Sequence, residues 1–219
     1  MNARDLPYKE LVHGTKQFII PIFQRDYSWG TKNCLRLWED IIRVGSDPAA
    51  KGHFIGSVVY IAAEDSTASI SRWLLIDGQQ RLSTLTLLLV ALRNQLEKEQ
   101  AKEDYPTPEE IDDHFLINRY GKGDQKSKLA LRRMDHETLL AYIEGKEFPE
   151  NASEAIIENF QFFIEKLEDA DLGVVYDGIN KLMVVDVHLT RGQDDPQMIF
   201  ESLNSTGVDL TEADLIRNF

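Results

Sequence analysis

A short apolar segment that runs directly into a long helical pattern is the feature that most constrains the fold of this chain. Residues 73–76 are apolar and predict a buried strand, which ends at the turn pair Asp77-Gly78. Beyond this turn, leucines recur at three- and four-residue steps, which predicts an amphipathic core helix over residues 79–100. The unpaired backbone N–H groups of the first helical turn are therefore expected directly at the end of a buried strand.

The junction between this strand and this helix carries more polar groups than a turn and a helix cap require. Residues 77–84 include one carboxylate, two side-chain amides, one guanidinium and two hydroxyls. Because a helix N-terminus favours negative charge, this composition predicts a site for an anionic group such as phosphate. The residues predicted to be catalytic are Asp77, Gln80 and Arg81, and those predicted to bind the nucleotide in this segment are Gly78, Gln79, Ser83 and Thr84.

Each polar side chain of the junction has a predicted role in that site. Arg81 would pair with a phosphate through two parallel hydrogen bonds, and Gln79 and Gln80 would position phosphate oxygens or a water molecule. Asp77 would hold a divalent cation or orient the attacking water, because a bare carboxylate would repel phosphate. The structural alternative is a capping box, with Asp77 as the N-cap and Gln80 as its partner. That alternative leaves Gln79 and Arg81 unexplained.

A second segment, residues 21–29, interleaves polar and aromatic side chains. Gln24 and Arg25 are predicted to contact phosphate, and Tyr27 or Trp29 is predicted to stack on a base. Fixed polar groups beside aromatic rings are what a nucleotide pocket requires. In the alternative interpretation, both aromatic residues pack in the core and Arg25 is a solvated charge.

Gly56 interrupts an apolar, β-branched run over residues 53–62 that predicts another buried strand. A glycine within a strand marks a bulge or a close approach to the backbone, either by a ligand or by a neighbouring helix. Gly56 and Ser57 are included among the predicted nucleotide-binding residues, and Ser57 would reach phosphate or a metal-bound water only if this strand borders the same pocket. Asn204 is included as well, although a helix C-terminus is sufficient to explain Asn204 and Gly207.

Composition limits the classes of function open to this chain. The formal net charge of -13 and the pI near 4.8 oppose a broad grip on a nucleic-acid backbone but are compatible with a small basic pocket. The single cysteine, Cys34, excludes an internal disulfide and fits a reducing cytoplasm, which is the predicted location. No apolar stretch is long enough to cross a bilayer, and no Cys/His spacing is typical of a zinc site.

The remaining pattern predicts a β-containing core, residues 1–100, and a mostly helical extension that returns to it, residues 101–219. Further strands are predicted over residues 17–22, 70–76, 128–133 and 182–189. Helices are predicted over residues 5–12, 135–145 and 195–203, and from residues 31 or 33, 107, 151 or 153, and 211. Since the sequence ends inside the last of these helices, we expect that more protein follows or that the chain was shortened.

Four ordered motifs resemble the N-terminal domain of GmrSD-type type IV restriction enzymes, a domain that also occurs in related phage-defence proteins, including sensors of phosphorothioated DNA. The motifs are Pro21-x-x-Gln24-Arg25-x-Tyr27-x-Trp29, Phe54-x-Gly56-Ser57, Asp77-Gly78-Gln79-Gln80-Arg81-Leu82-x-Thr84-Leu85 and Phe200-x-x-Leu203-Asn204-x-x-Gly207, with Trp38 between the first two. The first and third motifs are quite specific in combination, and the match covers nearly the whole chain.

This resemblance implies a ParB/sulfiredoxin-like α/β (α+β) fold, with a small mixed sheet, helices and a mostly helical extension. It implies that the domain binds a nucleoside triphosphate and hydrolyses it with Mg²⁺ as cofactor, and thereby regulates DNA cleavage. The implied partners are a C-terminal or separate nuclease domain of the His-Asn-His type and DNA contacted through the full-length protein. This chain alone is therefore not expected to cut DNA. A homodimer is left open, and no membrane partner is expected.

The alternative function is a non-hydrolysing module that senses DNA modification. In that module the loop of residues 24–29 would read a modified base or backbone, and the turn at Asp77 would only support the fold. A third alternative is an interaction domain that binds neither nucleotide nor modified DNA.

Overall fold

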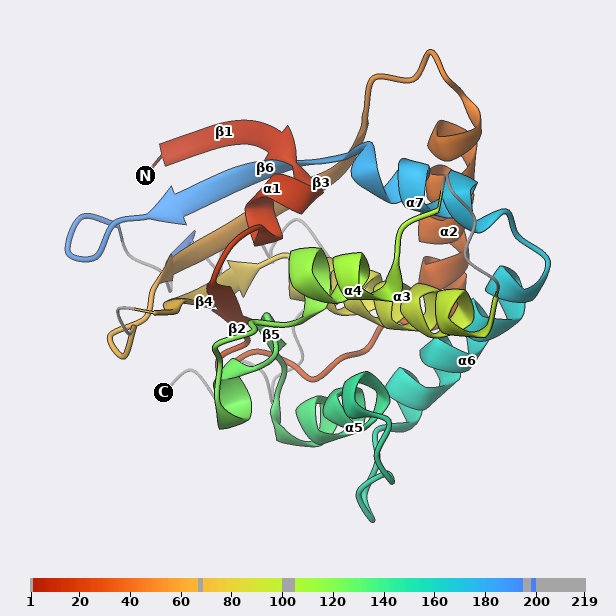
Figure 1. Cartoon of the computed structure of the whole chain (residues 1–219). Helices are drawn as coiled ribbons and strands as arrows, with labels where there is room; N and C mark the ends of the chain where they lie inside the picture. Colours follow the sequence, from red (N-terminus) through yellow and green to blue (C-terminus); the bar gives the residue numbers. More distant parts are fainter. Residues whose placement is uncertain (1, 67–68, 100–104, 195–197, 200–219) are drawn as a thin grey trace.

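Six strands from distant parts of the chain form one mixed sheet in the computed structural model, which describes residues 2–66, 69–99, 105–194 and 198–199 (Figure 1). Along the sheet, these described strands follow the order β1-β6-β3-β4-β2-β5. Their bounds are β1 Asn2–Pro7, β2 Lys16–Ile19, β3 His53–Ala62, β4 Ser71–Asp77, β5 Leu129–Ala130 and β6 Leu182–Leu189. The fold is therefore of the predicted mixed α/β class.

Neighbouring strands of the sheet run in both directions. β3 lies between β6, which is parallel to it, and β4, which is antiparallel, and β2 is parallel to both β4 and β5. β1 pairs with β6 in antiparallel register, so that Asn2 lies opposite His188. The first and last described strands are thus neighbours, and the late part of the chain returns to the sheet.

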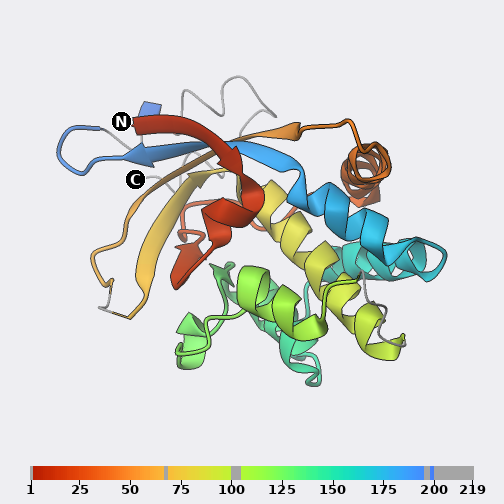
Figure 2. The same cartoon turned by 45° about the horizontal axis from the view of Figure 1, so that its top comes forward.

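The helices gather on one side of the sheet, around α3 (Figure 2). Their bounds are α1 Tyr8–Val12, α2 Thr31–Ser46, α3 Gln79–Lys98, α4 Pro108–Ile111, α5 Arg133–Glu144, α6 Glu154–Glu168 and α7 Leu172–Asn180, with a short π-helix, η1 Asp112–Leu116, and a 3₁₀ turn, η2 Gly123–Gln125. α3 begins directly after β4, as the sequence pattern predicts. The junction between these two elements therefore lies where the sheet meets the helices.

α3 is buried on nearly every side over most of its length. All residues from 82 to 93 are buried, because α4 and α6 pack against it along with η1 and the sheet. The hydroxyls of Ser83, Thr84 and Thr86 each donate a hydrogen bond of 2.8 Å to the carbonyl oxygen four residues earlier. These bonds satisfy the polar side chains, so they can be buried. The predicted helix is confirmed, but residues 82–93 form a continuous buried segment, and the exposed residues of the helix lie in its last turns.

Helix α7, which the sequence pattern did not predict, packs closely on α2 through two glycines. A Cβ atom at Gly45 would lie 2.1 Å from the carbonyl oxygen of Val174, and one at Gly178 would lie 2.2 Å from that of Ile41. Glycine lowers helix propensity, so Gly173 and Gly178 obscure this helix in the sequence. The close approach holds α2, which carries one wall of the site described below, against the rest of the fold.

Two local predictions were wrong. Residues 5–7 belong to β1 and not to a helix, because they pair with β6, and the helix begins only at Tyr8. Asp135 is not a helix cap, because it lies inside the first turn of α5, whose N-cap is Arg132. The carboxylate of Asp135 instead accepts a hydrogen bond of 2.8 Å from the backbone N–H of Tyr27.

Other predictions agree with the described structure. The strands predicted over residues 53–62 and 182–189 are β3 and β6, and the strand predicted over residues 128–133 is shorter, as β5. The larger hydrophobic core joins both parts of the predicted division, with members such as Leu6, Leu85, Phe163 and Val184. The boundary near residue 100 stays a prediction, and the helices predicted over residues 195–203 and from 211 lie outside the described residues. Among the helices of the described part, none combines the length and apolar character needed to cross a membrane.

Candidate functional site

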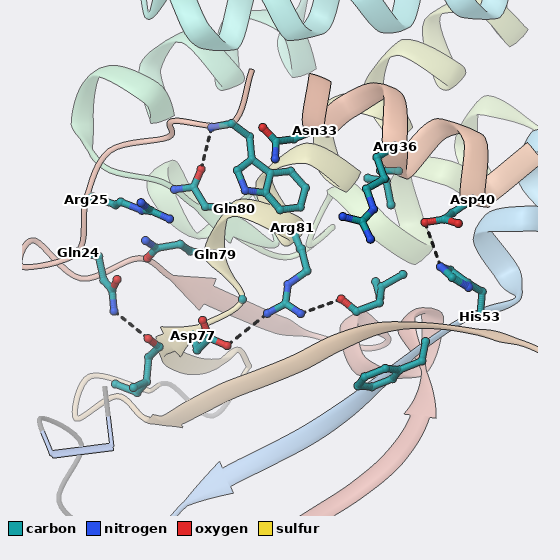
Figure 3. Close-up of a pocket in the computed structure, with 16 residues that line it drawn as sticks. Gln24, Arg25, Asn33, Arg36, Asp40, His53, Asp77, Gln79, Gln80 and Arg81 are labelled. Atoms are coloured by element: carbon teal, nitrogen blue, oxygen red, sulfur yellow. Dashed lines mark hydrogen bonds and ion pairs between the residues drawn. The ribbon is translucent and has the colours of Figure 1, made fainter. Parts of the chain in front are cut away.

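A cavity of about 490 Å³ lies where β4 runs into α3 (Figure 3). Three segments form its walls: the loop between β2 and α2, the exposed side of α2 with the start of β3, and the β4–α3 junction. The lining residues are Gln24, Arg25, Trp29, Asn33, Arg36, Leu37, Asp40, His53, Phe54, Ile55, Ile76, Asp77, Gly78, Gln79, Gln80 and Arg81. The predicted junction and the predicted aromatic loop therefore border the same cavity.

Gly78 makes the abrupt change from strand to helix. Its φ of +94° lies in the left-handed region, and a Cβ there would lie 3.1 Å from the carbonyl oxygen of Ser57. Gly78 is the N-cap of α3, and no side chain of the described residues caps this helix end. The capping-box alternative for Asp77 and Gln80 is therefore wrong, because Asp77 is the last residue of β4. The backbone N–H groups at the start of α3 have no side-chain cap and lie beside the cavity.

Arg81 is held across the cavity floor between β3 and β4. One terminal nitrogen, Nη1, donates a hydrogen bond of 2.7 Å to the carbonyl oxygen of Ile55, and Nη2 forms an ion pair of 3.2 Å with Oδ2 of Asp77. Gly56 has a φ of +110°, and a Cβ at that position would lie only 1.5 Å from Nη1 of Arg81. The glycine in β3 is thus explained by a side chain of the neighbouring helix, at a point where the register between β3 and β6 shifts.

Asp77 and Ser57 meet at the edge of this arrangement. The Oγ of Ser57 donates a hydrogen bond of 3.4 Å to Oδ2 of Asp77, the same oxygen that faces Arg81. Neither Ser57 nor Gly56 is among the lining residues, so the structure places both behind the cavity wall. Their contacts support Arg81 and Asp77 from behind.

Two further arginines belong to the cavity wall. The side chains of Arg25 and Arg36 make no hydrogen bond or ion pair with the part of the chain that the structure describes. With Arg81, the lining holds three arginines against two aspartates, Asp40 and Asp77, which gives a local balance of +1. The whole chain carries -13, so this cavity is a local positive region on an acidic protein.

At the α2 end of the cavity, Asp40 joins His53 and Arg43. Oδ1 of Asp40 accepts a bond of 2.6 Å from Arg43, and Oδ2 lies 3.2 Å from Nε2 of His53. Nη2 of Arg43 also lies 3.3 Å from Nδ1 of His53, which fits an imidazole that carries its proton on Nε2. Burial works against the carboxylate, but the hydrogen bond from Arg43 and the nearby positive charge outweigh it and lower the pKa of Asp40.

Sequence reasoning missed this α2 wall. The polar residues Asn33, Arg36 and Asp40 follow one another at three- and four-residue steps, so they share one face of α2. The adjoining face is buried and includes Cys34, Trp38 and Ile41. A polar stripe of this kind on a helix that follows the aromatic loop was the available signal. Figure 3 shows Arg36, Asp40 and His53 on one side of Arg81, and Arg25 and Gln79 on the other.

Three predicted nucleotide-binding residues lie in the core and do not line the cavity. Tyr27 is 7 % exposed, and its hydroxyl is 2.7 Å from Oγ1 of Thr84 and accepts a bond of 3.1 Å from Asn159. Burial raises the pKa of the Tyr27 hydroxyl. Ser83 and Thr84 are fully enclosed and donate to backbone carbonyls of α3. The core interpretation therefore describes Tyr27, whereas Trp29 does line the cavity. Asn204 lies outside the described residues.

The three glutamines of the cavity differ in their partners. Gln24 donates a hydrogen bond of 2.9 Å from Nε2 to the carbonyl oxygen of Ile76, which fixes the loop to the end of β4. Gln80 bonds three times to the loop backbone, as described below. Gln79 is 8 % exposed, and its Oε1 is buried with no hydrogen-bond partner in the described structure. Among the three, only Gln79 has an amide oxygen that is both buried and without a hydrogen-bond partner in the described structure.

Comparison with protein-family models identifies the family of this chain. Residues 8–219 match the family model described as GmrSD restriction endonuclease, N-terminal domain. The chain belongs to this family. A comparison with curated proteins gave no match. Membership in the GmrSD family confirms the resemblance of the sequence motifs and supports a role in restriction and defence.

Proposed function

We propose that this GmrSD-family domain binds a nucleoside triphosphate in the cavity at the β4–α3 junction and hydrolyses it to regulate DNA restriction. The observation that carries the proposal is the pair Arg25 and Arg36, which have no partner among the described residues. They line the same cavity as Arg81 and the start of α3, which no described side chain caps. Guanidinium groups and helix N-termini are both well suited to bind phosphate. The volume of about 490 Å³ is within the usual range for small-ligand pockets.

In this proposal the phosphates lie at the α3 end of the cavity. Arg25 and Arg36 would pair with phosphate oxygens, and the backbone N–H groups at the start of α3 would add donors without cost in side-chain entropy. Arg81 is already oriented by Ile55 and Asp77, so its charge would stabilise the negative charge that develops on the transferred phosphoryl group. Trp29 and Phe54 supply the apolar surface that a base requires.

Asp77 fits Mg²⁺ as a single protein ligand. Its side-chain hydrogen bonds and its ion pair in the described structure all involve Oδ2. Mg²⁺ in nucleotide sites is commonly held by one or two carboxylates together with water and substrate phosphates, where it neutralises phosphate charge. No group of three His, Cys, Asp or Glu side chains converges within the described ranges, so a cage of protein ligands is not expected there. The metal ion would therefore bind together with the nucleotide.

Gln79 is the side chain best suited to orient the attacking water. Its buried Oε1 lacks a donor, and a water molecule in the cavity would supply one. A phosphate oxygen would not, since it has no proton to donate at neutral pH. We therefore assign water orientation to Gln79 and charge stabilisation to Arg81.

Ligand binding provides the first test. Thermal-shift measurements with each nucleoside triphosphate and Mg²⁺ should show a concentration-dependent rise in melting temperature. Calorimetric titration with a non-hydrolysable triphosphate should then give affinities that fall roughly tenfold in Arg25→Gln and in Arg36→Gln, since each removes a charge-assisted hydrogen bond. Arg133→Gln is the matched control, because Arg133 lies on α5 with 91 % of its side chain exposed and does not line the cavity.

Two outcomes would contradict the proposal. The first is the absence of saturable binding of any triphosphate to the wild-type domain. The second is equal affinity in wild type, Arg25→Gln and Arg36→Gln. A thermal shift with modified DNA oligonucleotides and none with nucleotides would instead favour the DNA-sensing alternative, in which Arg25 faces a DNA backbone.

A further inference from the structure

The loop that carries Arg25 owes its shape to side chains from other elements. Residues 25–30 belong to neither helix nor strand. Their backbone polar groups therefore lack the regular partners that a ladder would supply, and buried groups of this kind must find others. In this structure the partners are side chains from α3, α5, α6 and the residue that precedes α5.

Gln80 supplies most of these partners. Its Oε1 accepts hydrogen bonds from the backbone N–H groups of Ser28, at 2.9 Å, and Trp29, at 3.1 Å. Its Nε2 donates a bond of 3.2 Å to the carbonyl oxygen of Asp26. With 7 % of its surface exposed, Gln80 has its amide oxygen and its amide nitrogen directed to one loop. Both ends of the amide are therefore bonded to the loop, and one N–H of Nε2 has no partner among the described residues.

Three other side chains complete the support. Asp135 accepts from the backbone N–H of Tyr27, and Asn159 donates to the carbonyl oxygen of Trp29. Arg132 donates a bond of 3.1 Å to the carbonyl oxygen of Gln24 and pairs with the carboxylate of Asp26 at 2.8 Å.

The backbone is consequently fixed on both sides of Arg25, at the peptide group that precedes it and at the peptide group that follows Asp26. The carbonyl oxygen of Gln24 is held by Arg132, and that of Asp26 is held by Gln80. The Arg25 side chain itself bonds to no described residue. Its direction into the cavity thus depends on the backbone at either side, and Gln80 both supports this backbone and lines the cavity.

We propose that Gln80 is a positioning residue, which fixes the 25–30 loop and through it directs Arg25 at the bound anion. This assignment rests on the proposed function and replaces the catalytic role that the sequence predicted for Gln80. The two adjacent glutamines then have separate tasks, since Gln79 presents its amide to the cavity and Gln80 presents its amide to the protein.

Amide hydrogen exchange tests, without any ligand, whether Gln80 fixes the 25–30 loop. Gln80→Met keeps the side-chain volume and removes all three hydrogen bonds, so amide exchange at Ser28 and Trp29 should accelerate roughly tenfold or more, while α3 keeps its protection. Gln80→Glu retains the acceptor for both N–H groups and should restore most of the protection at those two amides. Gln79→Met is the matched control and should leave loop exchange unchanged, because Gln79 makes no bond to the loop.

A double-mutant cycle tests whether Gln80 affects anion binding through Arg25. Inorganic triphosphate with Mg²⁺ is the probe, because it engages the anion groups without any base preference. Gln80→Met should weaken its binding roughly tenfold in the wild-type background and less than about twofold in the Arg25→Gln background, since the effect passes through Arg25. In the Arg36→Gln background the roughly tenfold effect should persist, because Arg36 is carried by α2.

Each result decides between the roles. Unchanged exchange at Ser28 and Trp29 in Gln80→Met overturns the assignment, and so does an equal loss of affinity with and without Arg25. A fall in turnover at saturating nucleotide with unchanged affinity also overturns it and returns Gln80 to a catalytic role. If the wild-type domain binds no triphosphate, the proposed function fails. The exchange result then still decides whether Gln80 holds the loop.

Discussion

Arg81 and Arg93 lie toward opposite ends of the same helix, and their surroundings differ. Arg93 is 6 % exposed, and its guanidinium donates to Asp112 and Ile143 at 3.0 Å each, to Tyr142 and to Asn94. Arg81 has two partners and lines a cavity. Both residues look alike in the sequence, since each is a single arginine in a leucine-rich helix.

The difference teaches how to separate structural from functional cations in this fold. An arginine whose donors are all used by protein joins elements together, and Arg93 joins α3 to η1 and to the end of α5. An arginine with donors left over beside a cavity is available to a ligand, as Arg25 and Arg36 are. Arg81 is intermediate, because it is held in place and still lines the cavity. Substitution of Arg81 should therefore lower turnover, whereas substitution of Arg93 should lower the free energy of unfolding.

The largest expected effect is the loss of triphosphate hydrolysis in Arg81→Ala. Removal of a preorganised charge from a transition state costs on the order of 10²–10³ in turnover. The fold should persist, because the pair with Asp77 is partly exposed and contributes no more than about 1 kcal/mol to stability. Phosphate release and urea unfolding measure the two quantities. Near-wild-type turnover in a folded variant would remove Arg81 from the mechanism and abolish the contrast between the helix ends.

Arg93→Met should show the reverse pattern. The substitution leaves Asp112 without its partner and the carbonyl oxygens of Tyr142 and Ile143 without a donor, so the free energy of unfolding should fall by about 2–4 kcal/mol. Turnover per folded molecule should not change, because Arg93 does not line the cavity. Urea unfolding followed by an assay under conditions where the variant is folded separates the two effects. Unchanged stability, or turnover lost from a folded variant, would mean that filled donors do not mark a structural role.

A smaller effect is expected from Gly56→Ala, which changes the position of Arg81 and not its identity. A Cβ at residue 56 would displace Nη1 of Arg81 from the carbonyl oxygen of Ile55, and we expect turnover to fall roughly 10- to 100-fold. Gly14→Ala is the matched control, because Gly14 also has a positive φ, of +81°, but has no atom within 4 Å of an added Cβ. Both variants should lose about 1 kcal/mol of stability from backbone strain. Equal turnover in the two variants would show that the orientation of Arg81 is unimportant.

The sequence was informative where one segment determines its own structure. β3 and β6 are largely apolar and β-branched, and their predicted bounds agree with the described strands. The β4–α3 junction was recognised because its polar groups are adjacent in the chain. β1 was missed because residues 2–5 are exposed and show no alternation, and only pairing with β6, about 180 residues later, makes them a strand.

The site was predicted only in part, because side-chain direction depends on tertiary packing. Gln79 and Gln80 are identical in sequence, yet one amide lies at the cavity and the other is bonded to the loop. Tyr27 stands among cavity residues in the sequence but points into the core, where Thr84 and Asn159 bond to its hydroxyl. The polar stripe of α2 is visible in the sequence, but its place beside the β4–α3 junction depends on how α2 packs in the fold, including its contact with α7.

The smallest expected effect tests whether the rule of filled donors extends to lysine. Lys128 is 4 % exposed, and its ammonium donates to the carbonyl oxygens of Val12 at 3.0 Å and Gly14 at 2.6 Å, so it should be structural, like Arg93. Burial, with a contribution from the nearby charge of Lys16, lowers the pKa of Lys128 to about 8.

The sign of the pH dependence follows from proton binding. Between pH 8 and 10.5 the unfolded chain keeps the Lys128 proton and the folded protein releases it, so the free energy of unfolding rises with pH through this window. Well below pH 8 both states carry the proton, and Lys128 makes no contribution to the pH dependence of stability. Between pH 8 and 9.5 the gain should be about 1–2 kcal/mol. Urea unfolding of wild type and Lys128→Met at both pH values measures this gain. The difference between the two proteins removes the contribution of the other titrating groups, because both proteins share them. Parallel pH profiles of the free energy of unfolding in the two proteins would show that Lys128 stays protonated in the fold. A triphosphate affinity that follows the same titration would show that Lys128 binds ligand, like Arg25, and is not purely structural, like Arg93.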